Sequence, residues 1–269
     1  MTSRSPSPSS SLPLRGRRIA VTGSPTSGSR LGARLRELGA DILDLPLIEI
    51  RHAVEKERAF EVFNELAHYE WILFSSRNGV EHFFKIFLQT YEDIRSLGFM
   101  RIAAIGEGTA EAIRAFHLKV DVQPETATAE ALGEALRAEQ SLDNLRVLLI
   151  TGNRNREDLQ RLLENERAIV DTFPVYATEP TDLADHPGAR QFREQGADAL
   201  IFASASAVQS FGEQAAHLKL KKGATVPALC SFGPQTSARM RQAKIPIAVE
   251  AVSPGIEPLV EGLLEKFGR

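Results

Sequence analysis

Four short polar turns carry the residues whose types and spacing could do chemistry. Each holds Ser, Thr or Asn side chains able to cap a following helix, which leaves free backbone N–H groups and the positive end of a helix dipole directed at a ligand. Such turns bind carboxylates or phosphates without needing a lysine. A single turn of this kind is most often only a helix cap, whereas four of them, two in each half of the chain, favour a large ligand with many anionic groups. The turns are "FSSRNGV" (74–80), "IGEGTAEA" (105–112), "FASASAV" (202–208) and "FGPQTSAR" (232–239).

Four arginines lie within or beside these turns and could add positive charge, although a surface arginine is more often only solvated. They are Arg77, Arg154, Arg156 and Arg239.

The turns belong to a sequence that repeats itself. The stretch "YEWILFSSRNGVEHFF" (69–84) has a counterpart in "ADALIFASASAVQSF" (197–211). Landmarks recur at nearly the same offset: Pro46 and Pro174 are 128 positions apart, and Thr109 and Thr236 are 127 apart. A nearly constant offset of this kind indicates internal duplication, so we expect two similar halves.

Strands and helices alternate along both halves, which is typical of parallel βαβ units with helices on both faces of each sheet. Ligands bind at the carboxyl ends of the strands in such folds, where all four turns lie. We therefore predict an α/β protein of two similar domains. The predicted strands are "RRIAVTG", "DILDLPLIEI", "WILFSS", "RIAAIG", "KVDV", "LRVLLITG", "AIVDTFPVYAT", "ADALIFAS", "VPALCSFG" and "IPIAVE", and the predicted helices include 54–67, 79–90, 108–116, 128–138 and 256–267.

Two extended segments broken by proline, "LPLIEI" and "FPVYAT", occupy equivalent places in the two halves. We expect them to form a two-strand linker in which the chain crosses between domains at 46–50 and returns at 174–178. Tyr176 in the second crossing would then face an inter-domain cleft.

The bulk composition indicates no nucleic-acid or membrane partner. The chain has 269 residues, 43% of them hydrophobic and 25% charged, with a formal net charge of -3. The Ser/Pro-rich start has no apolar core of signal-peptide length, and no later segment approaches about 18 uncharged apolar residues. We expect a disordered tail at 1–14 and a cytoplasmic location. The single cysteine, Cys230, excludes an intrachain disulfide and is interpreted as a buried strand residue.

No metal or cofactor motif is present. The six histidines are too far apart in the sequence for a local two-histidine metal motif, and the chain has no GxGxxG, GxxxxGK[ST] or GxSxG. The loop "GSPTSGS" only loosely resembles a phosphate loop. We expect neither a metal nor a cofactor. The histidines are His52, His68, His82, His117, His186 and His217.

Over about residues 15 to 267 the sequence resembles the uroporphyrinogen-III synthase family. The order and spacing of several weak motifs together make the resemblance specific. They are "IAVTGSP", "GADILDLPLIEI", "WILFSSRNGV", "AAIGEGTAEAI", "VDVQPETATAEAL", "FPVYAT", "ALIFASASAV", "CSFGPQTSARM" and "AVSPGIEPLVEGL".

The resemblance implies a discontinuous domain 1 (15–45 plus 179–269) and a middle domain 2 (51–173). It also implies a cofactor-free enzyme that closes hydroxymethylbilane, a linear tetrapyrrole with eight carboxylates, to uroporphyrinogen III. The last pyrrole ring is inverted and water is lost. The enzyme's main contribution would be to fold the substrate so that the substituted α-carbon of the last pyrrole ring attacks first. We expect a monomer whose partner is this small molecule.

The family's tyrosine in the returning crossing aligns with Tyr176, and a neutral phenol there could act as a general acid. The other residues carried over by alignment would line the cleft and bind substrate. They are Ser76, Arg77, Asn78, Thr109, Ser204, Ser206 and Thr236.

The sequence also departs from the family pattern. The family often has an arginine directly after the first "VT", where this chain has Gly23 and Ser24. Two alternatives stay open: a catalytically inactive tetrapyrrole-binding or regulatory module of the same fold, and a flavodoxin-like nucleotide binder. The second is disfavoured by the missing phosphate motif and by the duplicated layout.

Overall fold

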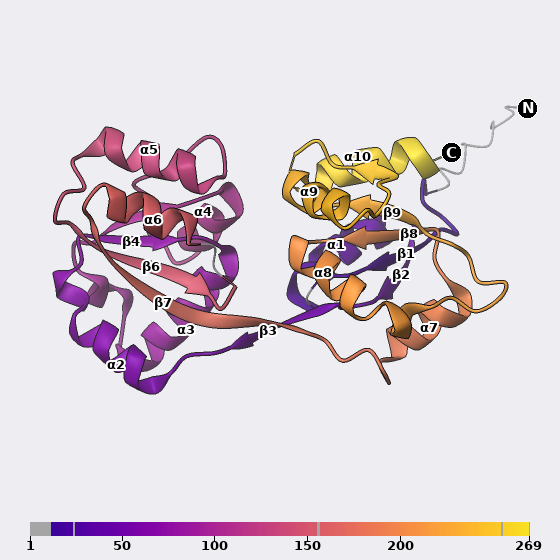
Figure 1. Cartoon of the computed structure of the whole chain (residues 1–269), viewed down its shortest axis with the longest axis horizontal. Helices are drawn as coiled ribbons and strands as arrows, with labels where there is room; N and C mark the ends of the chain where they lie inside the picture. Colours follow the sequence, from indigo (N-terminus) through magenta and orange to yellow (C-terminus); the bar gives the residue numbers. More distant parts are fainter. Residues whose placement is uncertain (1–11, 24, 155–156, 254, 269) are drawn as a thin grey trace, which may run out of the picture. The chain divides into compact units, whose positions relative to one another are not determined.

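The computed structural model describes residues 12–23, 25–154, 157–253 and 255–268. Within these ranges the chain forms two compact units (Figure 1). Unit 1 contains the described residues up to Glu49 and those from Glu179 onward, and unit 2 is Ile50–Thr178. Each unit has a sheet of parallel strands with helices on both faces, so the predicted fold class is confirmed.

Unit 1 contains a five-stranded sheet whose central strand is β8. All of its pairings are parallel, and Ile19 of β1 lies between Ile42 and Ala199 of its two neighbours. In sheet order the strands are β10 (Val249–Glu250), β9 (Ala228–Ser231), β8 (Ala199–Phe202), β1 (Arg18–Val21) and β2 (Asp41–Asp44).

The helices of unit 1 cover both faces of this sheet. One apolar cluster joins Leu35 of α1 and Leu259 of α10 to the strands, and the other joins Phe192 of α7 and Met240 of α9 to the opposite face. The helices are α1 (Pro25–Glu37), α7 (Pro187–Gln195), α8 (Ala205–Glu213), α9 (Pro234–Gln242) and α10 (Ile256–Phe267), with a 3-10 turn η3 (Ala215–Leu218).

Unit 2 repeats this plan with four parallel strands and an edge strand, β3. The interior strand β4 reads Trp71, Ile72, Leu73, Phe74 and is buried throughout, as expected of a parallel strand covered on both faces. In sheet order the strands are β3 (Ile48–His52), β7 (Ile169–Pro180), β6 (Arg146–Gly152), β4 (Trp71–Phe74) and β5 (Arg101–Ala104).

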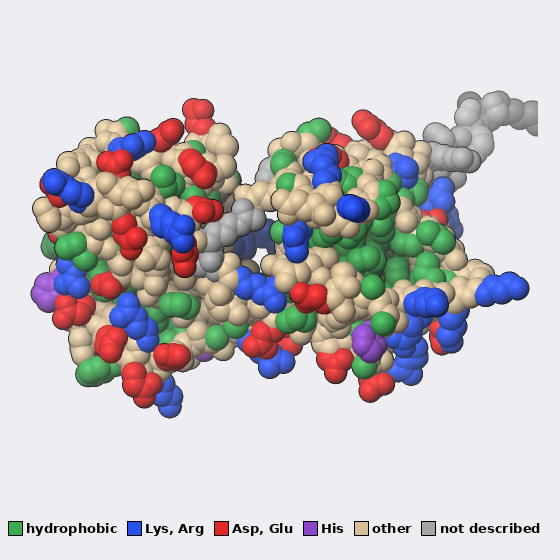
Figure 2. All heavy atoms as spheres, viewed as in Figure 1, with side chains coloured by type: hydrophobic (Ala, Val, Ile, Leu, Met, Phe, Trp, Pro, Cys, Tyr) green, Lys and Arg blue, Asp and Glu red, His purple; other side chains and the backbone are tan. Residues whose placement is uncertain are grey.

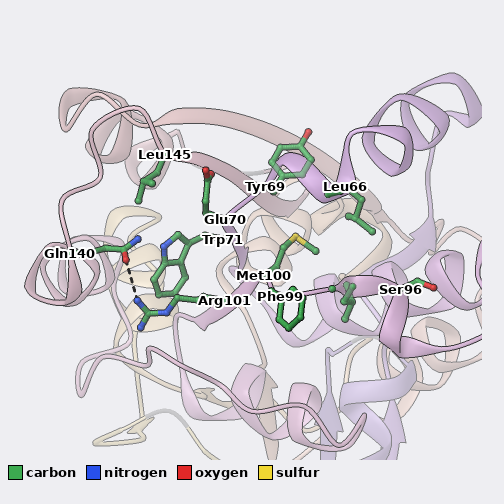
Figure 3. A pocket seen from close by; sticks show the side chains of 13 residues that line it. Leu66, Tyr69, Glu70, Trp71, Ser96, Phe99, Met100, Arg101, Gln140 and Leu145 are labelled. Carbon is green, nitrogen blue, oxygen red and sulfur yellow. Dashed lines mark hydrogen bonds between the residues drawn. The ribbon is translucent and has the colours of Figure 1, made fainter.

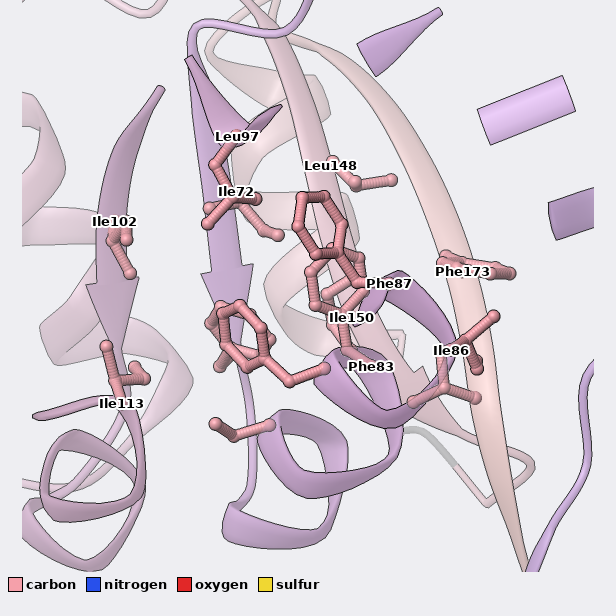
Figure 4. Packing of buried hydrophobic residues seen from close by; sticks show 14 of the residues in the cluster. Ile72, Phe83, Ile86, Phe87, Leu97, Ile102, Ile113, Leu148, Ile150 and Phe173 are labelled. Carbon is pink, nitrogen blue, oxygen red and sulfur yellow. The ribbon is translucent and has the colours of Figure 1, made fainter. Parts of the chain in front are cut away.

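In the described part of unit 2, five helices and two 3-10 turns cover the sheet. On one face, Phe83 and Phe87 of α3 pack on Ile72, Ile150 and Phe173 of the strands (Figure 4). On the other face, α5 and α6 pack on the opposite side chains of the same strands. The elements are α2 (Lys56–Asn64), η1 (Leu66–His68), α3 (Arg77–Thr90), η2 (Ile94–Leu97), α4 (Glu107–Arg114), α5 (Ala129–Glu139) and α6 (Asp158–Asn165).

The two crossing segments pair with each other as β3 and β7. The backbone N–H of Ala53 donates to Val175, and that of Thr181 donates to Leu47. Between these two contacts the residue numbers fall along β3 while they rise along β7, so the two strands are antiparallel.

The interruption expected at Pro46 is confirmed, because "DILDLPLIEI" forms two strands, β2 and β3, which lie in different sheets. Pro46 lies between them and has no N–H to donate to a ladder. Two other sequence-based expectations were wrong in detail. Pro174 does not break its segment, since β7 runs through it; the pairing with β6 shifts register at Thr151 and Gly152 beside it, and such irregularities accommodate proline. "KVDV" forms only an isolated bridge, at Val122.

Candidate active site

Ser76 lies in the polar turn that follows β4. Its extended backbone lets its Oγ accept a hydrogen bond from the Gly79 N–H at 3.1 Å, which makes it the N-cap of α3. The remaining N–H groups of the first turn and the positive end of the helix dipole therefore lie at the carboxyl edge of the sheet. Arg77 and Asn78, the first two helical residues, are half-exposed there.

Tyr176 lies beside Ser76. The two hydroxyl oxygens are 3.0 Å apart and share a hydrogen bond. Tyr176 belongs to β7 and Ser76 follows β4, and β6 separates these strands in the sheet, so the phenol must pass over the end of β6. Sequence-based reasoning selected both residues but did not foresee this contact.

Gly152 at the end of β6 is the residue over which the phenol passes. A Cβ atom there would lie 2.5 Å from the nearest ring carbon of Tyr176 and 2.9 Å from its hydroxyl, closer than such atoms approach. The register shift between Thr151 and Gly152 sets Gly152 opposite Tyr176. The absent side chain is what permits this phenol orientation, and no motif in the sequence pointed to Gly152.

Arg77 connects the first two polar turns. Its guanidinium donates to Glu111 of α4 at 2.7 Å, and Nη2 lies 3.9 Å from the place where a Cβ of Gly108 would be. Thr109, the third residue of α4, is 7% exposed. The positive charge of Arg77 is thus directed at a carboxylate of its own unit.

Unit 1 carries the other three predicted residues. Ser204 is the N-cap of α8, and its Oγ accepts from the Ala207 N–H at 3.2 Å, matching Ser76. Ser206 is half-buried in the first turn of the same helix, and Thr236, the third residue of α9, is 5% exposed. Because β8 and β9 are adjacent and parallel, these two helix starts are neighbours at one edge of the sheet.

The four turns are not all capped in the predicted way. Gly106 and Gly233 are the N-caps of α4 and α9, and neither helix has a side-chain cap. The threonines expected to cap these helices sit instead at the third helical position, where they are buried. The glycine turns therefore offer their backbone N–H groups without competition from a capping side chain.

A buried serine pair supports the last turn. Ser237 donates to Ser231 Oγ at 2.8 Å, and Ser231 donates to the carbonyl of Gly233 at 3.0 Å. Both side chains are fully buried. They fix the loop before α9, and nothing in the sequence distinguished them from other serines.

The remaining arginine candidates differ from Arg77. Arg154 is exposed, and Arg239 makes a hydrogen bond of 3.5 Å to Gln242 in its own helix. Arg156 lies outside the described residues, as does Ser24.

Cys230 is confirmed as a buried strand residue. It lies in β9 and is 0% exposed, and burial raises the pKa of its thiol to about 12. A thiol that stays protonated at neutral pH is a poor nucleophile.

Unit 2 also contains a hollow of about 530 Å³ at the opposite, amino end of its strands (Figure 3). Trp71, Phe99 and Met100 line it, and the Arg101 guanidinium lies 4.2 Å over the Trp71 ring while donating to Gln140. Since the polar turns lie at the carboxyl ends, this hollow is separate from the candidate active site.

Two further observations apply to the described ranges only. None of the helices there is long and apolar enough to span a bilayer, and no three His, Cys, Asp or Glu side chains gather where they could hold a metal ion. On the face of unit 2 shown in Figure 2, acidic and basic side chains are interspersed.

The fold and the polar turns define a class of protein: two similar α/β units, each with helix N-termini at the carboxyl ends of its parallel strands. The sequence profile described as uroporphyrinogen-III synthase HemD matches residues 29–261. The chain therefore belongs to the uroporphyrinogen-III synthase family, as the resemblance predicted.

Individual relatives agree with this assignment. The chain is 27% identical over 256 residues to the porphyrin biosynthesis protein HemD of Ruminiclostridium josui, spanning 95% of this chain and 50% of that one. It is 28% identical over 262 residues to the uroporphyrinogen-III synthase of Synechococcus elongatus, spanning 94% of each. The chain thus spans about half the length of the first relative and nearly all of the second.

Solved structures confirm the fold. Uroporphyrinogen III synthase of Thermus thermophilus, in a mutant form, superimposes with a TM-score of 0.63 at 17% identity, covering 93% of this chain and 98% of that one. The enzyme of Helicobacter pylori gives a TM-score of 0.61 at 18% identity, covering 93% and 99%.

Proposed function

We propose that this chain catalyses the closure of hydroxymethylbilane to uroporphyrinogen III, with inversion of the last pyrrole ring and loss of one water molecule. Family membership supports this reaction. The observation that carries it is the hydroxyl of Tyr176, hydrogen-bonded to Ser76 at the N-terminus of α3, at the edge of the sheet where α/β proteins bind ligands.

Tyr176 acts as the general acid in this proposal. The C–O bond of the hydroxymethyl group breaks as the phenol donates its proton, so the hydroxyl leaves as water and an electrophilic azafulvene remains. The substituted carbon of the last ring attacks it and forms a spiro intermediate, which fragments and recloses with that ring reversed. The phenolate recovers a proton as the closing ring regains aromaticity, and the net change is the loss of water.

Ser76 would prepare the phenol for this step. Its Oγ accepts the Gly79 N–H, and the hydroxyl pair orients the proton of Tyr176. The shape of the binding surface, rather than further side-chain chemistry, would then select inversion over direct closure.

The polar turns would bind the eight carboxylates of the substrate. Helix N-termini attract anions through free N–H groups and the helix dipole, and each unit supplies two such turns. In this proposal Arg77, Asn78 and Thr109 of unit 2 and Ser204, Ser206 and Thr236 of unit 1 contact substrate. In this proposal the enzyme is cytoplasmic and works as a monomer. Light scattering can check the monomeric state.

The test is to supply freshly prepared hydroxymethylbilane, oxidise the products and resolve the isomers. We expect the type III isomer to form much faster than the substrate closes spontaneously. The spontaneous closure yields the type I isomer. Type I product alone, formed at the rate of the enzyme-free control, would refute the proposal. If tetrapyrrole binding persisted in that case, the inactive binding module would be the better description.

A further inference from the structure

His82 of α3 packs against Tyr176. The ring centroids are 5.9 Å apart and the planes are inclined by 32°. Helix α3 therefore contacts the phenol twice, through the hydroxyl of its N-cap Ser76 and through the imidazole of His82. No part of the reaction proposed above uses this histidine.

His82 is itself held by His52, a residue of β3. Their Nδ1 atoms are 3.1 Å apart, whereas the ring centroids are 5.4 Å apart with planes inclined by only 18°. Since the nitrogens approach much more closely than the ring centres, the rings meet edge to edge through these atoms. One Nδ1–H donates to the other Nδ1, so the bond exists only while one of the two nitrogens is unprotonated.

The surroundings keep this pair neutral. The titratable groups that the structure records facing His82 are His52 from β3, Lys85 from its own helix and Tyr176 from β7. Burial lowers the pKa of His82, and His52 and Lys85 lower it further; burial and then Lys85 lower the pKa of His52. Both pKa values thus lie below the ordinary histidine value of about 6.5, and the bond persists at neutral pH.

We propose that His82 is a positioning residue for Tyr176, held against the phenol by its hydrogen bond to His52. The inference rests on the proposed function, because it concerns the same hydroxyl. His82 closes one side of the phenol, Ser76 fixes its oxygen, and Gly152 leaves room for its ring.

As the pH falls through the lowered pKa values of the two imidazoles, both gain protons, the Nδ1 atoms both become donors, and the bond is lost. Turnover should therefore decline on the acid side while the pair is present. Removing His52 should lower turnover at neutral pH and flatten the acid decline.

The decisive variants are His52→Ala and His82→Phe, each made alone and together with Tyr176→Phe. We expect each single variant to lose roughly threefold to tenfold in kcat with little change in KM, because the phenol is misplaced while the carboxylate-binding turns are intact. In the Tyr176→Phe background the same changes should cost nothing further. The matched control is His217→Ala, an exposed histidine of unit 1, which should match the unaltered protein.

A second readout does not depend on catalysis. Imidazole ¹⁵N spectra of the unaltered protein should show one protonated and one bare Nδ1 for the pair, and His52→Ala should remove this coupling. If His82→Phe does not fold, the exposed His52 still provides the test.

Normal kcat and an unchanged acid decline in His52→Ala would overturn the inference. It would also be overturned if His52→Ala or His82→Phe lowered kcat further in the Tyr176→Phe background. If the unaltered protein forms only type I product, the proposed function fails, whereas absence of the coupled ¹⁵N signals would refute the histidine pair itself.

Discussion

Ser76 and Tyr176 are 100 positions apart in the chain, yet their hydroxyl oxygens are 3.0 Å apart. The contact spans three strands, because the phenol reaches from β7 across Gly152 of β6 to the residue that follows β4. The helix cap and the proposed proton donor are therefore one hydrogen-bonded unit.

Tyr176→Phe should lower kcat about 100-fold with little change in KM, because it removes the proposed proton donor and leaves the ring in place. Steady-state formation of type III product is the measurement. The matched control is Tyr69→Phe. The hydroxyl of Tyr69 lies at the amino end of the sheet and donates to Asp171 over 2.7 Å. That variant should lose about 1 kcal/mol of stability and keep its activity. Equal activity in both variants would remove Tyr176 from the mechanism.

Gly152→Ala should displace the phenol while leaving the fold intact. The added methyl group would meet the end of the Tyr176 side chain, which can swing away, so we expect a kcat loss similar to that of Tyr176→Phe and a nearly unchanged unfolding midpoint. Gly212→Ala is the control, since a Cβ there meets nothing within 4 Å. A fully active Gly152→Ala variant would contradict the positioning role of this glycine.

Ser76→Ala and Ser204→Ala should be equally destabilising but unequal in catalysis. Each removes an N-cap, at a cost of about 1 kcal/mol measured by urea unfolding. Ser76→Ala alone also removes the hydroxyl partner of Tyr176, so kcat should fall in this variant, whereas Ser204→Ala should mainly raise KM. Identical kinetic effects would argue against a special role for Ser76.

Glu111→Gln should tighten substrate binding. Glu111 forms an ion pair with the guanidinium of Arg77 and places a negative charge near the proposed site for the substrate carboxylates. Its neutralisation should lower KM about threefold at low salt, and Arg77→Gln should raise KM roughly tenfold. Glu139→Gln is the control, because Glu139 forms a similar pair with Arg101 at the amino end of β5. Unchanged KM in both Arg77→Gln and Glu111→Gln would exclude Arg77 from the binding site.

The sequence was sufficient to predict the fold class and to place the four polar turns after the carboxyl ends of strands. Alternating apolar strands and amphipathic helices specify parallel α/β units, and the nearly equal offsets of the proline pair and the threonine pair indicate the duplication. These are local patterns of burial and periodicity, so they can be read along one chain. The strand expected over "KVDV" is absent, and only an isolated bridge forms there. Whether a short extended segment joins a sheet depends on its neighbours in space, which local sequence does not specify.

Tertiary structure alone decided how the site residues meet. His52 and His82 are 30 positions apart, and their separation argued against a local two-histidine motif, yet they share a hydrogen bond. Gly152 matters only because a ring from the neighbouring strand lies over it. The types of turn follow from local sequence, although glycine rather than the expected threonine caps two of the four helices. The contacts of Tyr176 follow from sheet order and register, which form only when distant strands pair.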